Sequence, residues 1–187
     1  MPPKIKVTKE DIIKTTIQLV RDNGVASINA RAIASSLNCS TQPIFSNFDS
    51  MEELEEKTIF SAYELYLDFI NQEVESGQYP KYKSFGMAYI RFAKQEKELF
   101  KLLFMRDRSE EEQSLSPDFD ESVKMIMSAN GVTDEIARLM HLELWSFVHG
   151  IATMLATSFL ELEWDLISDM LTDVYQGIRS RYIKGDA

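Results

Sequence analysis

Apolar residues recur along this chain of 187 residues at intervals of three and four, the spacing of one face of an α-helix. The chain has only 7 Gly and 5 Pro to interrupt this pattern. Long periodic runs with so few breakers favour helices over many short strands. The sequence therefore predicts an all-α fold of about nine helices and no strand.

Three short helices are expected in the first 50 residues. The first spans about residues 8–23, with Thr8 as its N-cap, and ends at Gly24. The second spans about 29–37 and is capped by Asn29. A tight turn follows, and Ser40 is expected to cap the third helix, whose Pro43 sits in the first turn. Two short helices joined by a tight turn describe a helix-turn-helix.

The rest of the chain is expected to form a larger helical body. Ser50 and Glu53 have the spacing of a capping box and open a long helix that continues to about Glu75. Further helices are expected over about 84–94, 96–105, 116–130, 133–160 and 164–183. The predicted domains are therefore residues 1–49, a helix-turn-helix with a basic N-terminal arm, and residues 50–187, the helical body.

The net charge of −10 at first disfavours nucleic acid as a partner, but its distribution does not. Residues 1–50 carry +2, which leaves −12 for residues 51–187. Such asymmetry suggests that the N-terminal end meets nucleic acid. No signal peptide or membrane span is apparent, and the single Cys39 cannot form an intramolecular disulfide, so a cytoplasmic protein is expected.

A helix-turn-helix places its second helix in the major groove, with the first turn of that helix at the base edges. Gln42 in that turn can bind adenine bidentately, and the methyl group of Thr41 can touch thymine. The N-terminus at Asn29 can receive a phosphate, and the lysines before it form a cationic arm. The candidate DNA-binding residues are Lys4, Lys6, Lys9, Asn29, Arg31, Ser40, Thr41, Gln42, Pro43, Phe45, Ser46 and Asn47.

Residues 9–54 resemble the N-terminal domain of TetR-type bacterial transcription regulators. The likeness rests on a helix ending at Gly24 and on the run INARAIASSLNCSTQPIFSNFDSMEEL at 28–54; LWSFVHG at 144–150 is also similar to one subgroup. The resemblance implies a homodimeric repressor that binds double-stranded operator DNA and is released by a small-molecule effector. The family usually has Tyr, His and Lys where this chain has Phe45, Asn47 and Met51. Phe45 and Met51 therefore cannot make the usual phosphate contacts, and Ser46, Asn47 and the lysine arm are expected to replace them.

The body is rich in Met and aromatic residues. Most of these suit an ordinary core, but some can line an adaptable apolar cavity, and the resemblance implies such a cavity among the middle helices. The candidate ligand-binding residues are Met87, Tyr89, Phe92, Phe100, Phe104, Met125, His141, Trp145 and His149. Both histidines are also explained as hydrogen-bonded core residues.

Two amphipathic stripes near the C-terminus can pair with their copies as a four-helix bundle. The candidate dimer residues are Val148, Ile151, Leu155, Phe159, Ile167, Met170, Leu171, Val174 and Ile178, with Gly150 permitting close backbone approach. The alternative is that these stripes only close the core of one protomer. The resemblance favours dimerisation.

Neither a cofactor nor a metal is expected. His141 and His149 are about 12 Å apart along one helix, too far to share an ion. Cys39 in the turn is interpreted as a packed thiol. No nucleotide-binding or nucleophile motif indicates an enzyme. The alternative function is a helical protein–protein adaptor that does not bind DNA.

Overall fold

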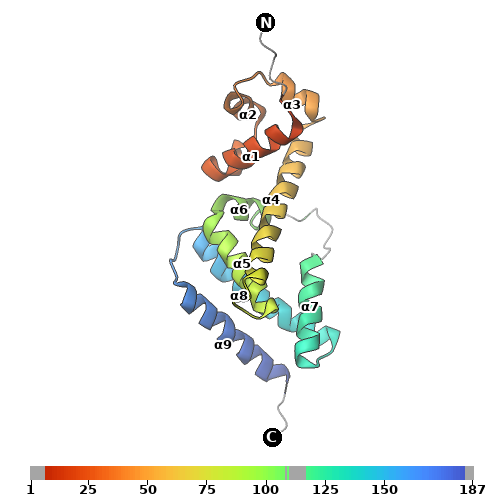
Figure 1. The fold of residues 1–187 in the computed structure, drawn as a ribbon, viewed down its shortest axis with the longest axis vertical. Helices are drawn as coiled ribbons and strands as arrows, with labels where there is room; N and C mark the ends of the chain where they lie inside the picture. The colour runs from red at the N-terminus through yellow and green to blue at the C-terminus, as the bar shows by residue number, and fades with distance from the viewer. Residues whose placement is uncertain (1–6, 108, 110–116, 184–187) are drawn as a thin grey trace. The chain divides into compact units, whose positions relative to one another are not determined.

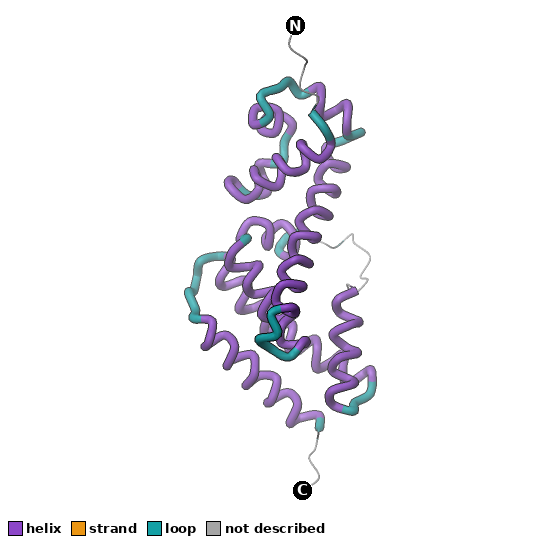
Figure 2. Tube along the Cα trace, viewed as in Figure 1, coloured by secondary structure: helices purple, strands orange, loops and turns teal. Residues whose placement is uncertain are grey.

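The computed structural model of the chain describes residues 7–107, 109 and 117–183. These residues form nine α-helices and one short 3-10 helix, without a strand among them (Figures 1 and 2). The elements are α1 (Lys9–Asn23), η1 (Val25–Ser27), α2 (Ala30–Ser36), α3 (Gln42–Asn47), α4 (Met51–Glu75), α5 (Lys81–Gln95), α6 (Lys97–Phe104), α7 (Pro117–Asn130), α8 (Asp134–Ala156) and α9 (Trp164–Tyr182). The predicted all-α fold is confirmed.

The chain divides into two compact units. One comprises Met1–Asp68 with Glu96–Arg106, and the other comprises Phe69–Gln95 with Asp107–Ala187. In the first unit, the three-helix segment α1–α3 is called the head below; α6 and most of α4 belong to the same unit. The second unit is called the body. The predicted domains divide between residues 49 and 50. In the structure, most of α4 belongs to the same compact unit as the head.

Helix α1 begins and ends where its sequence predicts. Thr8 Oγ1 accepts a hydrogen bond from the backbone N–H of Asp11, whose carboxylate accepts in return from the backbone N–H of Thr8. This reciprocal capping box satisfies two amides that the first turn of a helix leaves unpaired. Gly24 ends the helix at φ 75°, a backbone conformation that a residue with a side chain rarely adopts.

The head is held together by a small apolar core. One side chain or more from each of α1, α2 and α3 is buried in it, and the start of α4 contributes another. Its buried members are Ile12, Ile33, Ala34, Ile44, Phe48 and Leu54. Burying a side chain of this size contributes about 1.5–3 kcal/mol. Such a core fixes the orientation of the two short helices, which could not be stable alone.

The turn between α2 and α3 is a Schellman motif. The N–H of Cys39 donates to the carbonyl of Ala34, and the N–H of Asn38 donates to that of Ser35. Asn38 has φ 51°, in the left-handed region that Asn tolerates better than most residues. The sequence Asn38-Cys39 thus turns the chain sharply and sets the direction in which α3 leaves α2.

Helix α5 packs against α8, α9 and α7 in the body, and α8 also packs against α7 and α9. Gly86 of α5 permits this close approach. A Cβ at this position would lie 3.0 Å from Leu171 Cδ2 of α9 and 3.5 Å from Val148 Cγ2 of α8. A second apolar cluster joins α7, α8 and α9 around Ile126 and Met140.

Two helix boundaries in the body differ from the sequence prediction. Helix α5 begins three residues earlier than expected, directly after Pro80, whose carbonyl accepts from Ser84 N. Helix α8 ends at Ala156 and not near residue 160. A second Schellman motif stops it, because Ser158 has φ 56° and the N–H of Phe159 donates to the carbonyl of Met154. Over the described part of the chain, none of the helices has the length and apolar character needed to cross a membrane.

Candidate functional site

The N-cap of α3 is Thr41 and not Ser40, which corrects the sequence prediction. Thr41 has helical φ and ψ, and its side chain makes no capping hydrogen bond. The reason lies in Pro43, which has no N–H for a capping oxygen to accept from. The next amide, Ile44 N, donates to the backbone carbonyl of Thr41 at 3.1 Å. The side chains of Ser40 and Thr41 are therefore not committed to capping this helix.

Helix α3, together with its C-cap residue Phe48, has a buried inner face and an exposed outer face. Ile44 and Phe48 are 0 % and 2 % exposed and belong to the core of the head. Gln42 and Phe45 are exposed, and they are three residues apart, so they project from neighbouring positions of the helix. Within the described residues the amide of Gln42 has no hydrogen-bond partner. It is therefore available for a partner outside the chain.

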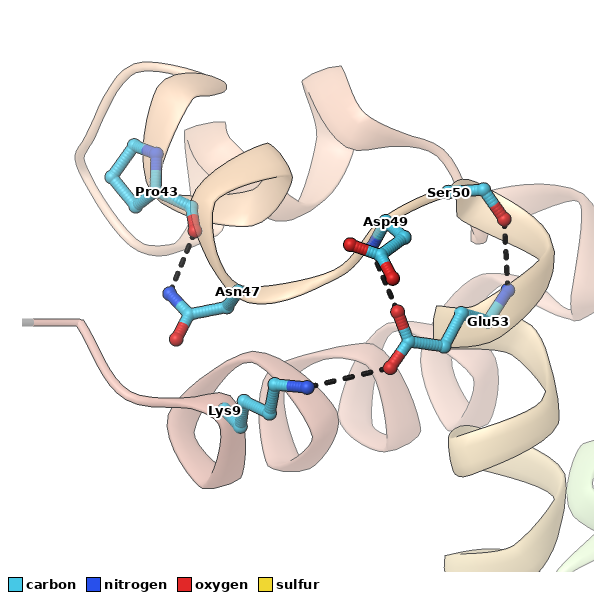
Figure 3. Close-up of polar contacts among 6 residues, drawn as sticks. All are labelled: Lys9, Pro43, Asn47, Asp49, Ser50 and Glu53. Carbon is cyan, nitrogen blue, oxygen red and sulfur yellow. Dashed lines mark hydrogen bonds and ion pairs between the residues drawn. The ribbon is translucent and has the colours of Figure 1, made fainter.

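Ser46 and Asn47 are placed differently from what the sequence suggests. Ser46 Oγ donates to the carbonyl of Gln42 at 2.9 Å. Asn47 Nδ2 donates to the carbonyl of Pro43 at 2.7 Å (Figure 3) and to that of Val7 at 3.5 Å. Phosphates accept hydrogen bonds, so a phosphate contact from either residue would require these internal bonds to be exchanged. Phosphate binding by Ser46 and Asn47 remains a prediction.

Lys9 is already paired within the first unit. Its ammonium lies 3.3 Å from Glu53 Oε1 (Figure 3) and 4.9 Å from the centroid of the Phe48 ring. The other oxygen of Glu53 accepts from Asp49 N, while Ser50 Oγ accepts from Glu53 N. The Asp49 amide lowers the pKa of the Glu53 carboxyl, and Lys9 lowers it further. The expected Ser50–Glu53 cap is thus present, with the Asp49 amide as the partner of Glu53.

Arg31 is the cation of the helix-turn-helix that the structure leaves accessible. It is exposed on α2, and among the described residues it has neither an ion-pair nor a hydrogen-bond partner. Asn29 caps the same helix by accepting from Ala32 N at 2.9 Å, as its position in the sequence predicts. The arm residues Lys4 and Lys6 lie outside the described residues.

The positions of the acidic residues add information that the net charges of the two ends do not contain. The chain has 30 acidic residues, yet none lies between Asp22 and Asp49. This segment contains all of α2 and α3 together with the turn that joins them. A polyanion can therefore approach these two helices without meeting a carboxylate on either of them.

The head is also tied to α6 within the first unit. The guanidinium of Arg21, near the end of α1, donates through Nε and Nη2 to the two carboxylate oxygens of Glu96, both at 2.8 Å. The hydrogen bonds to Glu96 raise the pKa of Arg21. Nearby, a Cβ at Gly24 would lie 3.0 Å from Glu98 Oε2 of α6. This contact could not be predicted from the sequence, because the partners are 75 residues apart.

The candidate ligand-binding residues fall into both units. Phe100 and Phe104 belong to the first unit, where their ring centroids are 5.2 Å apart, and the others belong to the body. Burial varies within the set. Met87, Phe92 and Phe100 are fully buried, Tyr89 and His141 are nearly so, Phe104, Met125 and His149 are half-buried, and Trp145 is 43 % exposed.

Two tyrosine–histidine pairs join α5 to α8 in the body. Tyr82 Oη lies 2.9 Å from His141 Nδ1, and Tyr89 Oη lies 2.8 Å from His149 Nδ1. Both histidines are therefore hydrogen-bonded, as the core interpretation predicts. The Phe119 ring meets the His141 ring edge-on at 4.5 Å, and the Trp145 ring stacks on His149 at 5.1 Å.

Burial determines the protonation state of these groups. It lowers the pKa of His141 from 6.5 to about 4, and it also lowers the pKa of His149. Burial raises the pKa of Tyr82. At pH 7 the Tyr82–His141 pair is thus uncharged, with the tyrosine hydroxyl hydrogen-bonded to a neutral imidazole. The two tyrosine–histidine pairs thus place polar groups without net charge at the contact between α5 and α8.

Most of the residues predicted to form the dimer surface are taken up by the protomer itself, which corrects that assignment. Val148, Ile151, Leu155, Ile167 and Leu171 are at most 9 % exposed, and Val174 and Ile178 pack against the α7–α8 cluster. Met170 is half-buried. These positions instead fit the alternative stated above, in which the two stripes close the core of one protomer. Only Phe159, just beyond α8, is well exposed, at 74 %.

Another face of α8 carries the exposed apolar residues. Leu139 and Leu142 are 45 % and 50 % exposed, and Trp145 lies beside them. Leu139, Leu142, Ser146 and Gly150 follow one another at intervals of three and four, so they share one side of the helix. A Cβ at Gly150 would meet no atom within 4 Å. The open space at Gly150 shows that its lack of a side chain is not used inside the protomer.

Comparisons with known proteins agree with this fold. Residues 82–174 match the family model described as the tetracyclin repressor-like C-terminal domain. This match identifies residues 82–174 as a TetR-like C-terminal domain. Among solved structures, a TetR-like transcriptional regulator from Rhodococcus sp. RHA1 is similar with a TM-score of 0.60 and 14 % identity over 100 % of both chains. The search of curated proteins returned no significant match.

The family assignment confirms the resemblance found in the sequence and extends it to the body. The quoted motifs lie mainly in the head, whereas the matched family model covers α6, α7, α8 and most of α5 and α9. Transcription regulation is the function that the TetR-like fold supports, and the family is generally non-enzymatic. A TetR-like regulator implies two kinds of partner, DNA and a small-molecule effector.

Proposed function

We propose that the chain is a sequence-specific DNA-binding regulator of transcription whose α3 enters the major groove of operator DNA. The observation that carries this proposal is the outer face of the helix-turn-helix. Its exposed Gln42 amide has no partner among the described residues, and no acidic residue lies between Asp22 and Asp49 in a chain of net charge −10. A face of this kind suits hydrogen bonding to bases beside a polyanionic backbone.

Fluorescence anisotropy with labelled duplexes tests this proposal. The full chain is titrated onto DNA from upstream of its own gene and onto a scrambled duplex of the same composition. We expect tighter binding to the upstream DNA, and log affinity should fall with log salt at a slope of about −0.9 per neutralised phosphate. Equal binding to both duplexes, or affinity that does not change with salt, would favour the adaptor alternative.

Gln42→Ala and Gln18→Ala are matched variants for the base contact. Gln42 is exposed on α3, whereas Gln18 is exposed on α1 and donates to Asp22 Oδ1. Loss of a bidentate contact to adenine should cost about 1–3 kcal/mol of discrimination. We expect Gln42→Ala to reduce preference for the selected sequence and Gln18→Ala to leave it unchanged. The proposed placement of α3 is wrong if both variants behave alike.

The proposal includes a small, uncharged effector bound in the body. Its support is the pair of neutral hydrogen-bonding groups, Tyr82–His141 and Tyr89–His149, among aromatic side chains. A few polar groups in an apolar surround orient a small molecule, and neutral groups favour a neutral ligand. An apolar or amphipathic compound with one hydrogen-bonding group fits this chemistry better than an ion does.

The proposed regulation is release of a repressor from its operator by this effector. Helix α5, which supplies Tyr82 and Tyr89, passes at Glu96 directly into α6, and Glu96 binds Arg21 of the head. An effector that favours one arrangement of α5 would thereby act on the head through a covalently continuous segment. It can shift the population only by its differential affinity for the two states.

The effector proposal is tested in two steps. A library of neutral amphipathic compounds is first screened for compounds that raise the melting temperature of the full chain. A compound that passes is then added to the operator-binding titration, where operator affinity should fall. A compound that clearly binds the body but leaves operator affinity unchanged would contradict the proposed regulation while leaving DNA binding intact.

Homodimerisation is proposed through the exposed face of α8 that contains Leu139, Leu142 and Gly150. The open space at Gly150 allows the backbone of a second copy to approach closely, and a two-fold dimer would present two helix-turn-helix motifs to one operator. Sedimentation equilibrium should give a dimer for the native chain and a monomer for Leu142→Arg. The control Ala129→Arg, at an exposed position of α7, should remain dimeric. A native monomer, or a dimer unaffected by Leu142→Arg, excludes this face.

A further inference from the structure

Phe45 of α3 is an exposed aromatic residue, whereas Ile44 of the same helix and the C-cap residue Phe48 are buried. Its side chain is 55 % exposed, whereas Ile44 and Phe48 of the same segment are 0 % and 2 % exposed. The head therefore gains little from Phe45 as a core residue. An aromatic ring on the outer face of α3 is therefore accessible for a contact made outside the chain.

The neighbours of Phe45 limit what that contact can be. Gln42 lies three residues earlier on the same helix, and its amide is accessible. The two polar groups that follow Phe45 are engaged, since Ser46 donates to the carbonyl of Gln42 and Asn47 donates to that of Pro43. The outer positions of α3 thus combine one available amide with one apolar ring.

We propose that Phe45 recognises thymine 5-methyl groups in the major groove, beside an adenine bound by Gln42. This inference rests on the proposed function. The thymine methyl is the apolar group that base pairs present in the major groove, and Phe is a side chain that contacts it. Glutamine binds adenine, so an amide and a ring at adjacent positions match a step of A·T pairs.

Charge favours duplex DNA over a protein or lipid partner for this ring. The segment between Asp22 and Asp49 contains no carboxylate, and its Arg31 is accessible. An isolated aromatic ring flanked by polar residues is also not the broad apolar patch that a stable protein interface needs. Phe45 therefore acts as a specificity residue whose contact is apolar.

The test compares thymine with deoxyuridine, which lacks only the 5-methyl group. Duplexes that bind the full chain are selected from a random library, and each thymine of the selected site is then replaced singly by deoxyuridine. Removing a methyl group buried against Phe45 should weaken binding about fourfold. We expect this loss at one or two positions of each half-site, next to the adenine that Gln42→Ala makes dispensable.

Two variants assign the effect to Phe45. In Phe45→Ala, thymine and deoxyuridine should bind equally at those positions. Val25→Ala shortens the other large exposed apolar side chain among the described residues of α1–α3 and η1, which is 48 % exposed, and should retain the fourfold difference. The folded state of both variants is checked by their melting temperatures.

The outcomes separate this inference from the function on which it rests. Enrichment of a sequence together with equal binding of thymine and deoxyuridine at every position would overturn the inference and leave DNA binding supported. Persistence of the difference in Phe45→Ala would overturn it as well, because another group would then be contacting the methyl. Failure to enrich any sequence would overturn the proposed function itself.

Discussion

The head and the body of this chain keep their polar chemistry in opposite places. In the head, the candidate base-contacting residue Gln42 and the ring of Phe45 lie on the outside of a helix whose inner face is apolar. In the body, Tyr82 and His141 form a hydrogen-bonded pair in the interior, at the α5–α8 contact. The head thus presents its chemistry to a large partner, and the body encloses it.

This difference follows from what each region can build. Three short helices enclose a core of few side chains, so most other positions of the head face solvent. The longer helices of the body bury residues on several faces, and polar groups among them must find partners inside the protein. Substitutions of exposed head residues should therefore change binding at constant stability, whereas substitutions in the body should change stability first.

The largest expected effect is the contrast between two Phe→Ala substitutions. Phe92 of α5 is 0 % exposed and meets the Phe69 ring at 5.3 Å, whereas Phe45 of α3 is 55 % exposed. Phe92→Ala should lower the free energy of unfolding by about 3–5 kcal/mol, because it leaves a cavity. Phe45→Ala should change it by less than about 0.5 kcal/mol. Urea unfolding measures both, and similar losses would show that the ring of Phe45 also supports the fold.

A pH titration of stability gives the next largest effect. The pKa of His141 falls from 6.5 to about 4 in the folded chain because the imidazole is buried. Below pH 6.5 the unfolded chain binds a proton that the folded chain does not bind until about pH 4. Stability is therefore complete above this window and decreases as the pH falls through it. The loss between pH 7 and pH 5 should be about 2 kcal/mol.

The control for this titration is His141→Gln, whose side-chain oxygen can still accept from the Tyr82 hydroxyl. Carboxylates titrate in the same range, so the informative quantity is the difference between the two proteins. Urea unfolding at several pH values should give a smaller loss for His141→Gln than for the native chain. Parallel pH profiles would mean that the folded chain protonates His141 as readily as the unfolded chain does.

The local signals in the sequence were sufficient to predict the helices and several of their ends. Thr8 and Asn29 cap helices as expected, because capping depends on a few neighbouring residues. The prediction of Ser40 as a cap is wrong, because Pro43 has no amide N–H for its side chain to accept from. The early end of α8 was missed, since Ser158 is not a residue that normally indicates a left-handed turn.

Partners distant in the sequence could not be predicted in the same way. An amphipathic stripe shows that a helix face is covered, but not which surface covers it. For that reason, the stripes predict a dimer contact for Leu155 and Ile167, which lie in the core of the protomer. The Arg21–Glu96 pair and the two tyrosine–histidine pairs likewise depend on which helices pack together. Exposed residues of the head were easier to predict, since a recognisable motif fixes their positions.

The Arg21–Glu96 pair tests whether the head makes a strong polar contact with the rest of the first unit. The two hydrogen bonds are bidentate, but the Arg21 side chain is 34 % exposed. A double-mutant cycle with Arg21→Ala and Glu96→Ala should give a coupling energy of about 1 kcal/mol, near the upper end for exposed pairs. High salt should reduce this coupling. A coupling energy well above this value would mean that this contact of the head is as strong as a buried polar contact of the body.

The smallest effects are expected at the two Schellman turns, one in the head and one after α8. Asn38 and Ser158 both have positive φ, but Asn tolerates this conformation better than Ser does. Ser158→Gly should therefore raise the free energy of unfolding by about 0.5 kcal/mol, while Asn38→Gly should change it little. Ser146→Gly, at an exposed position inside α8, is the matched control and should lower stability by a similar amount, because glycine is a poor helix former.

Opposite signs for Ser158→Gly and Ser146→Gly in urea unfolding would show that backbone conformation decides the outcome. If Ser158→Gly instead lowers stability, contacts of the serine side chain contribute more than the strain at its backbone, and the turn after α8 is held by its side chains in a way that the turn of the head is not.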